Sequence, residues 1–290
     1  MRGVNTMADR TSTSTIERVC AATTSAADFH DKFVRTRRFC VLTGAQSGWR
    51  ARHAWQPETL AATLGGSKLR VDDRPAVTLT LAEYLAYADA NDDERPLSIF
   101  DSHIVKSLAE DYTAPAIIED GSLFADDPAP PTHRWLLVGA ARTGTPLHTD
   151  PLATSAWNAL VVGRKRWALF PPAAAGDASD DEKLLAASAR LGAAEFFDAF
   201  VPLTLEPSWR GPRPLLLTQR AGETVFVPEG FRHAVLNEEL AVAVTHNVAP
   251  PSAVERMLPL AADVCPAFAQ RVEARRKKRR RGREVTIERP

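Results

Sequence analysis

Hydrophobic and polar residues alternate in short runs along the second half of the chain, as they do in half-buried β-strands. Gly and Pro residues separate these runs, and the spacing predicts an antiparallel barrel or sandwich. The runs are Trp135 to Val138, Pro146 to Asp150, Ser155 to Val162, Lys165 to Phe170, Leu215 to Thr218, Thr224 to Val227, His233 to Asn237 and Leu240 to Asn247. We therefore expect a β core over residues 134–250. An insert at 171–214 interrupts it and has helical character from Asp180 to Leu191.

The first half of the chain predicts a mixture of helices and strands. Residues 1–26 are rich in Ser, Thr and Ala without periodicity, so we expect a flexible leader. Proline at position 57 and glycine at position 65 bracket one predicted helix. Thr80 and Glu83 have the spacing of a capping box that opens a second helix. Residues 27–133 should thus form an α/β part that supports the β core.

The C-terminal region predicts a helix followed by a cationic tail. Ser252 and Glu255 have capping-box spacing, which favours a helical segment at 251–274, and this segment is a candidate homodimer interface. Residues 275–290 begin with Arg275 to Arg283, a block of eight cations in nine positions. Such a block must be solvated, and it fits a nuclear-localisation signal or an RNA-binding patch. A plain solubilising tail is the alternative.

Composition narrows the class of protein. The chain has 290 residues, of which 44% are hydrophobic and 25% charged, as in soluble folded proteins. Neither a signal peptide nor a membrane-spanning apolar stretch is present, which disfavours secretion and membrane insertion. The formal net charge is zero, but removing the eight cations of the basic block leaves 28 basic against 36 acidic residues. Cys20, Cys40 and Cys265 lack disulfide or zinc spacing and are interpreted as reduced thiols.

Two residues in one run have the spacing of metal ligands. His148 and Asp150 lie two positions apart, so on a strand their side chains share one face. His233 opens a later run and is the best candidate for a third ligand. Two histidines and one carboxylate leave open positions on an octahedral metal, which is typical of non-haem Fe(II) oxygenases. A chance triplet, or a small-molecule enzyme of the cupin type with another divalent metal, remains the alternative.

The last run supports a bound molecule beside such a metal. Thr245 and Asn247 share one face with two alanines, which leaves a small polar surface. His246 alternates with them, so we expect it to point away from the metal. The tryptophans Trp135, Trp157 and Trp167 are interpreted as core residues rather than as a ligand cage.

The sequence from His148 to Pro171, HTDPLATSAWNALVVGRKRWALFP, resembles the core of the JmjC family, in particular its lysyl hydroxylases and arginine demethylases. The segments 222–228 and 233–247 continue the resemblance, which covers about residues 28–250 with its upstream parts at 39–49, 96–102 and 134–139. It implies a mainly β fold: a double-stranded β-helix barrel, of the cupin or jelly-roll kind, with helical additions at both ends.

The resemblance also implies a ligand set. His148, Asp150 and His233 would bind Fe(II), and Lys165 would pair with the distal carboxylate of 2-oxoglutarate, the cosubstrate that reacts with O₂. Further cosubstrate contacts would come from Thr245, Asn158, Thr145 and Asn247. A buried carboxylate does need a cation or several donors to offset its desolvation. The alternative for Lys165 is a solvated lysine in a hairpin.

Two positions depart from the family pattern. Ser98 stands where the family has a tyrosine that reaches the cosubstrate, which predicts weaker cosubstrate binding or a water in the vacated space. Arg232 stands where related chains carry an aromatic residue, which predicts a different substrate mouth.

The implied function is oxygenation of nuclear proteins, namely hydroxylation of lysine side chains, demethylation of methyl-arginine, or both. A non-catalytic JmjC scaffold and an oxygenase acting on RNA are the alternatives.

Overall fold

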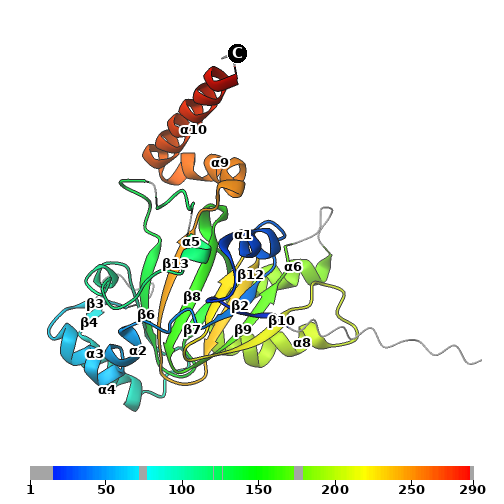
Figure 1. Cartoon of the computed structure of the whole chain (residues 1–290). Helices are drawn as coiled ribbons and strands as arrows, with labels where there is room; N and C mark the ends of the chain where they lie inside the picture. Colours follow the sequence, from blue (N-terminus) through cyan, green and yellow to red (C-terminus); the bar gives the residue numbers. More distant parts are fainter. Residues whose placement is uncertain (1–15, 72–76, 120, 126, 173–178, 288–290) are drawn as a thin grey trace, which may run out of the picture.

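The computed structural model describes residues 16–71, 77–119, 121–125, 127–172 and 179–287. Two β-sheets dominate it (Figure 1). The larger sheet has the strand order β1-β2-β11-β8-β13-β6-β5, and the smaller sheet has the order β10-β9-β12-β7. A separate pair, β3 (Leu69–Arg70) and β4 (Thr78–Leu79), lies beside them.

The strand bounds confirm all eight predicted β runs. The larger sheet consists of β1 (Arg18–Cys20), β2 (Cys40–Thr43), β11 (Thr224–Val227), β8 (Ser155–Val162), β13 (Ala241–Val248), β6 (Arg134–Gly139) and β5 (Ser98–Asp101). The smaller sheet consists of β10 (Leu215–Arg220), β9 (Arg164–Phe170), β12 (Arg232–Asn237) and β7 (Gly144–Thr149). The pairs within both sheets are antiparallel except β1 with β2. The predicted mainly β, jelly-roll type of fold is confirmed.

The inner faces of the two sheets pack against each other. Val41 and Val225 of the larger sheet share a core cluster with Trp167 and Val235 of the smaller one. Because side chains alternate along a strand, the remaining positions face outward and need their own cover. This alternation decides which residues can meet inside the barrel.

N-terminal helices pack on the outer face of the larger sheet. They are α1 (Ala26–Phe29), α2 (Ala51–Ala54), α3 (Pro57–Leu64), α4 (Leu81–Ala90) and α5 (Ala116–Glu119), with a π-turn at His30–Val34 and a 3₁₀ turn at Ile104–Lys106. The helix at 57–64 is as predicted, and both hydrogen bonds of the Thr80–Glu83 capping box are present. Leu60 and Tyr84 from these helices are fully buried in the same cluster as Trp157 of β8.

The insert covers the outer face of the smaller sheet. It forms α6 (Asp180–Ala187), a 3₁₀ turn at Ser188–Arg190, α7 (Ala193–Glu195), a π-turn at Phe196–Phe200 and α8 (Val201–Leu205), which confirms its helical character. Phe196 packs against Phe170 of β9 with ring centroids 6.2 Å apart. Residues 173–178 of the insert lie outside the described residues.

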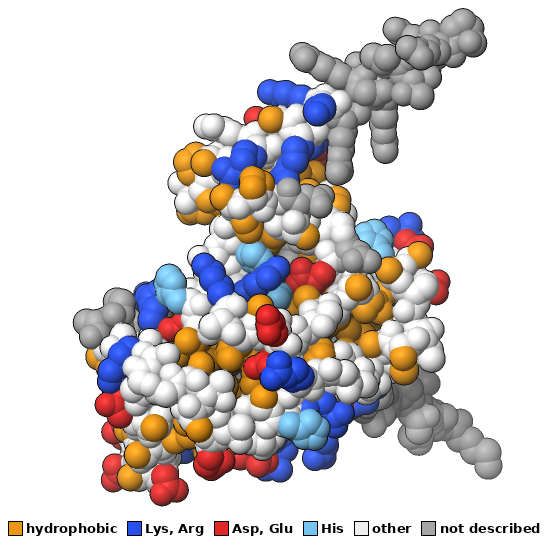
Figure 2. All heavy atoms as spheres, turned by 60° about the vertical axis from the view of Figure 1, so that its left-hand side comes forward, with side chains coloured by type: hydrophobic (Ala, Val, Ile, Leu, Met, Phe, Trp, Pro, Cys, Tyr) orange, Lys and Arg blue, Asp and Glu red, His pale blue; other side chains and the backbone are white. Residues whose placement is uncertain are grey.

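The C-terminal helices project beyond one end of the sheets (Figure 1). After a 3₁₀ turn at Pro251–Ala253, they are α9 (Val254–Val264) and α10 (Pro266–Ile287). The predicted cap at Ser252 is wrong, because α9 begins after Ala253 without a side-chain cap. Helix α10 continues through the expected boundary at residues 274 and 275, since the cations of the block are good helix formers. Figure 2 shows Lys and Arg side chains gathered on this projection.

Asp127 anchors α10 to the body. Its fully buried carboxylate accepts hydrogen bonds from the guanidinium groups of Arg271 and Arg275, at 2.8 and 2.9 Å. These contacts therefore fix the first turns of α10 against the rest of the protein, and the later basic residues follow in the same helix.

The prediction of a flexible leader through residue 26 is wrong for its last part. Strand β1 pairs with β2 and buries Val19, because even a three-residue strand can complete a sheet edge. Residues 1–15 of that leader lie outside the described residues. No helix in the described part is both long and apolar enough to cross a membrane.

Candidate metal centre

The pairing of β7 with β12 brings the predicted metal ligands together. His148 lies directly opposite His233 in this antiparallel pair. A bulge follows, where β7 carries one extra residue, so Thr145 also pairs on the inner face, opposite Val235. Pro146 sits within the bulge on an edge strand, where its missing N–H breaks no ladder hydrogen bond. Asp150 follows β7 directly.

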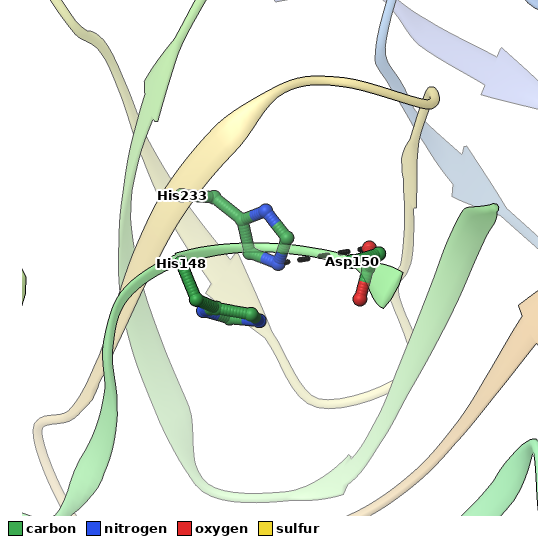
Figure 3. A group of neighbouring side chains, drawn as sticks. All are labelled: His148, Asp150 and His233. Atoms are coloured by element: carbon green, nitrogen blue, oxygen red, sulfur yellow. Dashed lines mark ion pairs between the residues drawn. The ribbon is translucent and has the colours of Figure 1, made fainter. Parts of the chain in front are cut away.

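The three side chains converge on one point (Figure 3). One ligand atom from each of His148, Asp150 and His233 lies within 4.8 Å of the others. Nε2 of His233 is 3.9 Å from Oδ2 of Asp150, and the two imidazole rings have centroids 4.2 Å apart. This is the three-donor face that the sequence predicts.

Backbone carbonyls orient both imidazole rings. Nδ1 of His148 lies 2.9 Å from the carbonyl oxygen of Pro146, and Nδ1 of His233 lies 3.2 Å from that of Phe231. Each Nδ1–H therefore donates to the backbone, which leaves the Nε2 lone pairs free. Burial lowers the pKa of His233 to about 4, so its ring is neutral at physiological pH. A neutral imidazole is the form that binds a metal ion.

Asn247 holds the third ligand in place. Its Nδ2 lies 3.4 Å from Oδ1 of Asp150 and donates a 2.9 Å hydrogen bond to the hydroxyl of Thr154. The sequence predicts Asn247 as a cosubstrate contact, and this stays a prediction; in the structure its amide group contacts the carboxylate of Asp150, a candidate metal ligand. Sequence reasoning missed Thr154, which no spacing signal singles out.

Lys165 lies inside the barrel and not on a solvated hairpin. Its side chain is 4% exposed, and it lines a cavity of about 150 Å³ together with Ser98, Thr145 and Asn237. Burial lowers the pKa of Lys165 to about 8. Its side chain makes no ion pair or hydrogen bond with any described residue. A buried cation without an anion is unfavourable, so this cavity is suited to an anionic ligand.

Asn158 and Thr245 lie on the adjoining part of the inner face, opposite each other on β8 and β13. The buried Oδ1 of Asn158 has no hydrogen-bond partner in the described part of the chain. Buried acceptors of this kind are rare and favour a site for a bound group. The Thr245 hydroxyl donates to the carbonyl of Trp157 at 2.8 Å, so it would have to rotate to donate to a ligand.

Outward positions of β12 and β13 have different contacts. Arg232 faces the insert and forms a 2.6 Å ion pair with Glu182 of α6, and its effect on the substrate mouth stays a prediction. His246 points away from the metal centre, as predicted, and contacts Glu119 and Tyr112. Period-two alternation places both side chains on the outward faces of their strands.

Two of the three predicted core tryptophans are confirmed. Trp157 is fully buried and Trp167 is 3% exposed. The prediction is wrong for Trp135, which is only half-buried. It lies at the margin of the larger sheet, where less structure covers it.

Comparison with known proteins agrees with this geometry. Residues 135–248, which run from β6 to the end of β13, match the family model described as "JmjC domain, hydroxylase". The chain carries a JmjC domain.

Curated relatives extend the similarity beyond the JmjC domain. The chain is 36% identical over 242 residues to "Bifunctional arginine demethylase and lysyl-hydroxylase psr-1" of Caenorhabditis elegans, which covers 80% of this chain and 60% of that protein. It is 32% identical over 234 residues to "Arginine-specific demethylase JMJ22" of Arabidopsis thaliana, covering 79% and 45%. It is 30% identical over 251 residues to "2-oxoglutarate and iron-dependent oxygenase JMJD4" of Homo sapiens, covering 77% and 58%. The chain thus spans about 60% or less of the length of these relatives.

The JmjC domain contains the whole candidate site. His148, Asp150 and His233 lie within residues 135–248, as do Lys165 and Asn158. Ser98 lies outside that range, on the edge strand β5, and closes one side of the Lys165 cavity. Of the two departures named from the sequence, Ser98 borders the Lys165 cavity, and Arg232 contacts the insert.

Proposed function

We propose that this chain is an Fe(II)- and 2-oxoglutarate-dependent oxygenase that acts on protein side chains. One observation carries the proposal: two imidazoles and one carboxylate converge in a β core that also buries a lysine with no anion among the described residues. The JmjC match and the names of the three relatives support it.

The donor set fits Fe(II). Two histidines and one carboxylate occupy one face of an octahedral ion and leave the opposite face open for other ligands. Bound Fe(II), with 2-oxoglutarate and O₂, would supply the oxidising chemistry that inserts an oxygen atom into a substrate C–H bond. His148, Asp150 and His233 would hold the ion, and Asn247 would keep the Asp150 carboxylate oriented.

The cavity residues would bind and orient the cosubstrate. Lys165 would pair with its distal carboxylate, which converts an unfavourable buried cation into a charge-assisted pair. Thr145 lines the same cavity, and Asn158 presents to the adjoining space an Oδ1 that has no partner among the described residues. Because Ser98 provides less wall than a tyrosine would, we expect the cosubstrate to depend heavily on Lys165.

The substrate we propose is a lysine or methyl-arginine side chain of a nuclear protein. The names of the relatives mention arginine demethylase and lysyl-hydroxylase activities, which differ only in the C–H bond attacked. Hydroxylation of a lysine methylene gives a stable alcohol, whereas hydroxylation of an N-methyl group gives a hemiaminal that loses formaldehyde.

Turnover assays test this function. Protein supplied with Fe(II), 2-oxoglutarate and O₂ should form succinate, and candidate peptides should gain one oxygen or lose one methyl group by mass spectrometry. His148→Ala should abolish both signals, whereas His53→Ala, an exposed histidine of α2, should not. A native protein that neither turns over nor binds 2-oxoglutarate would favour the scaffold alternative. Modified RNA in place of modified peptide would favour the RNA substrate.

The basic block supports nuclear localisation. Arg271 and Arg275 are engaged with Asp127, and Arg276 pairs with Glu255, so we place the receptor-binding part of the block after residue 276. A truncation after residue 276 leaves the anchor intact and should shift a fluorescently tagged protein from the nucleus to the cytoplasm. An unchanged distribution would contradict this assignment.

A further inference from the structure

Helix α9 contacts the two turns that flank the candidate metal ligands, although it lies outside the matched JmjC residues 135–248. On one side, Leu152 packs against the buried face of the helix, two positions after Asp150. On the other side, Arg256 pairs with Glu229 in the turn that leads into β12. The helix is therefore in contact with both segments that bring ligands to the centre.

Two guanidinium groups hold the Glu229 carboxylate, which is 8% exposed. Arg256 bonds both of its oxygens, through Nη2 to Oε1 and through Nε to Oε2 at 3.4 Å. Arg37, from the segment after the π-turn at 30–34, makes a single contact of 3.1 Å from Nε to Oε1. A two-point guanidinium–carboxylate pair fixes orientation as well as distance. Arg256 therefore sets the direction of the carboxylate, and Arg37 adds a second attachment.

The turn that contains Glu229 also orients the His233 imidazole. Phe231, two positions after Glu229, supplies the carbonyl oxygen that lies 3.2 Å from Nδ1 of His233. The turn itself is closed only by a long bond of 3.5 Å from the Phe231 N–H to the Pro228 carbonyl. The Glu229 N–H adds a 3.2 Å bond to the Ser155 hydroxyl. Because the closing bond is weak, the place of the carbonyl that orients His233 depends on how firmly Glu229 is held.

We propose that Arg256 is a positioning residue of the metal centre: through Glu229, it fixes the turn whose carbonyl orients the His233 ring. The inference rests on the proposed function, because it takes the triad as a metal site. Groups that hold a metal-bound histidine in place contribute to metal affinity without touching the metal. Helix α9 would thus be part of the metal centre and more than a support for α10.

The chain offers two controls that separate positioning from a plain docking role for the ion pair. Arg276 of α10 pairs with Glu255, the neighbour of Arg256 on α9, so Arg276→Met removes an ion pair of the same helix away from both turns. His148 is the internal reference, because its Nδ1 bonds the Pro146 carbonyl within its own strand β7. In the described structure, no hydrogen bond or ion pair joins Arg256 to that strand.

Imidazole NMR of the metal-free, full-length protein measures the ring orientation directly. The His233 ring is neutral near neutral pH, and long-range ¹H–¹⁵N correlations give the fraction of each tautomer. Both His233 and His148 should carry the proton mainly on Nδ1 in the native protein. Arg256→Met should raise the Nε2–H fraction of His233 about twofold or more and leave His148 unchanged, because only the His233 carbonyl partner loses its support.

Further variants sharpen the NMR test. Arg256→Lys keeps the charge but cannot make the two-point contact, so its tautomer fractions should lie between those of the native protein and Arg256→Met. Arg276→Met should match the native protein. An unchanged His233 ring in Arg256→Met, or equal changes in His233 and His148, would overturn the proposal.

Metal binding is measured with Co(II), whose visible ligand-field bands also report the geometry of its ligands. Arg256→Met should raise the dissociation constant for Co(II) about tenfold and alter these bands, whereas Arg276→Met should do neither. Adding Glu229→Met to Arg256→Met should weaken binding no further than Glu229→Met alone, since the two residues act through one pair. Fully additive losses would overturn the proposal. If the native protein binds no Co(II) but the His233 tautomers respond as expected, the control of the ring by Arg256 stands and the proposed oxygenase function fails.

Discussion

Strands β8 and β13 carry buried polar groups on both faces, and the two faces differ in how those groups are partnered. On the outer face, His246 contacts the Glu119 carboxylate at 2.8 Å through Nδ1 and the Tyr112 hydroxyl at 2.9 Å through Nε2. The indole N–H of Trp157 donates to the same carboxylate. On the inner face, Asn158 has an unpartnered oxygen and Lys165 of the facing sheet has no anion among the described residues.

The difference shows what separates a structural polar cluster from a ligand site in this fold. Burial lowers the pKa of both His233 and His246 to about 4, so protonation behaviour does not distinguish them. Their partners do. Both ring nitrogens of His246 are occupied, whereas Nε2 of His233 faces a carboxylate at 3.9 Å with room for an ion between them. A complete network stabilises the fold, and an incomplete one is available for ligands.

The largest expected effect is on the inner face. Asp150→Ala removes one of three donors, so the dissociation constant for Fe(II) should rise by about two orders of magnitude or more, and turnover should be lost. Because Asp150 is partly exposed and lies after the strand, the midpoint of urea unfolding should change little. Fe(II) binding is measured by anaerobic titration. A variant that bound iron as tightly as the native protein would remove Asp150 from the ligand set.

The matching change on the outer face should affect stability and leave the metal centre intact. His246→Ala leaves the Glu119 carboxylate buried without its main partner, which should lower the free energy of unfolding by about 3 kcal/mol. Tyr112→Phe removes only one neutral hydrogen bond and should cost about 1 kcal/mol. Urea unfolding measures both. Loss of iron affinity in a folded His246→Ala protein would contradict the separation of the two faces.

Lys165→Met keeps an unbranched side chain of similar size and removes the charge. The affinity for 2-oxoglutarate should fall about 10- to 100-fold, the contribution of a charge-assisted hydrogen bond in a buried site. Fe(II) affinity should be unchanged, since Lys165 lies apart from the triad. Isothermal titration in the presence of Mn(II) gives the 2-oxoglutarate constant, and anaerobic titration gives the Fe(II) constant. Unaltered cosubstrate affinity would show that the diacid binds elsewhere.

The pKa of Lys165 predicts how the affinity for 2-oxoglutarate depends on pH. Burial lowers this pKa to about 8, so the ammonium is charged below pH 8 and loses its proton above it. Since only the cation attracts a carboxylate, the dissociation constant for 2-oxoglutarate should rise about tenfold per pH unit above pH 8 and stay level below it. The Lys165→Met variant should lack this rise. A native constant that is level through pH 9 would contradict the ion pair.

The smallest effect concerns the turn after Asp150. Leu152 and Ala153 adopt left-handed backbone conformations, with φ of 58° and 51°, which are unfavourable for residues with a Cβ atom. Ala153→Gly should relieve part of this backbone strain, which stabilises the protein by about 0.5–1 kcal/mol. The larger conformational entropy that glycine loses on folding is subtracted from this gain. Thermal unfolding measures the change. Destabilisation would show that the Ala153 methyl group contributes packing that outweighs the strain.

The sequence predicts the inner face of the barrel well because strand alternation is a local property. The runs at 146–150 and 233–237 each place their ligands on one face, and the structure brings those faces together. Alternation does not reveal whether a polar residue finds a partner. The role of Asn247 depends on Thr154 and Asp150, and the exposure of Trp135 depends on how much of the sheet edge is covered. The short strand at 18–20 also has too few residues to give a pattern, and its burial comes entirely from the neighbouring strand.

The most direct test of the central claim is optical. Anaerobic addition of 2-oxoglutarate to the Fe(II)-loaded protein should produce the visible metal-to-ligand charge-transfer absorption that arises when a 2-oxoacid chelates ferrous iron. The account predicts this band in the native protein and in Tyr112→Phe, and its absence in Asp150→Ala. A native protein that binds both Fe(II) and 2-oxoglutarate without the band would contradict the placement of the diacid on the open face of the His148, Asp150 and His233 triad.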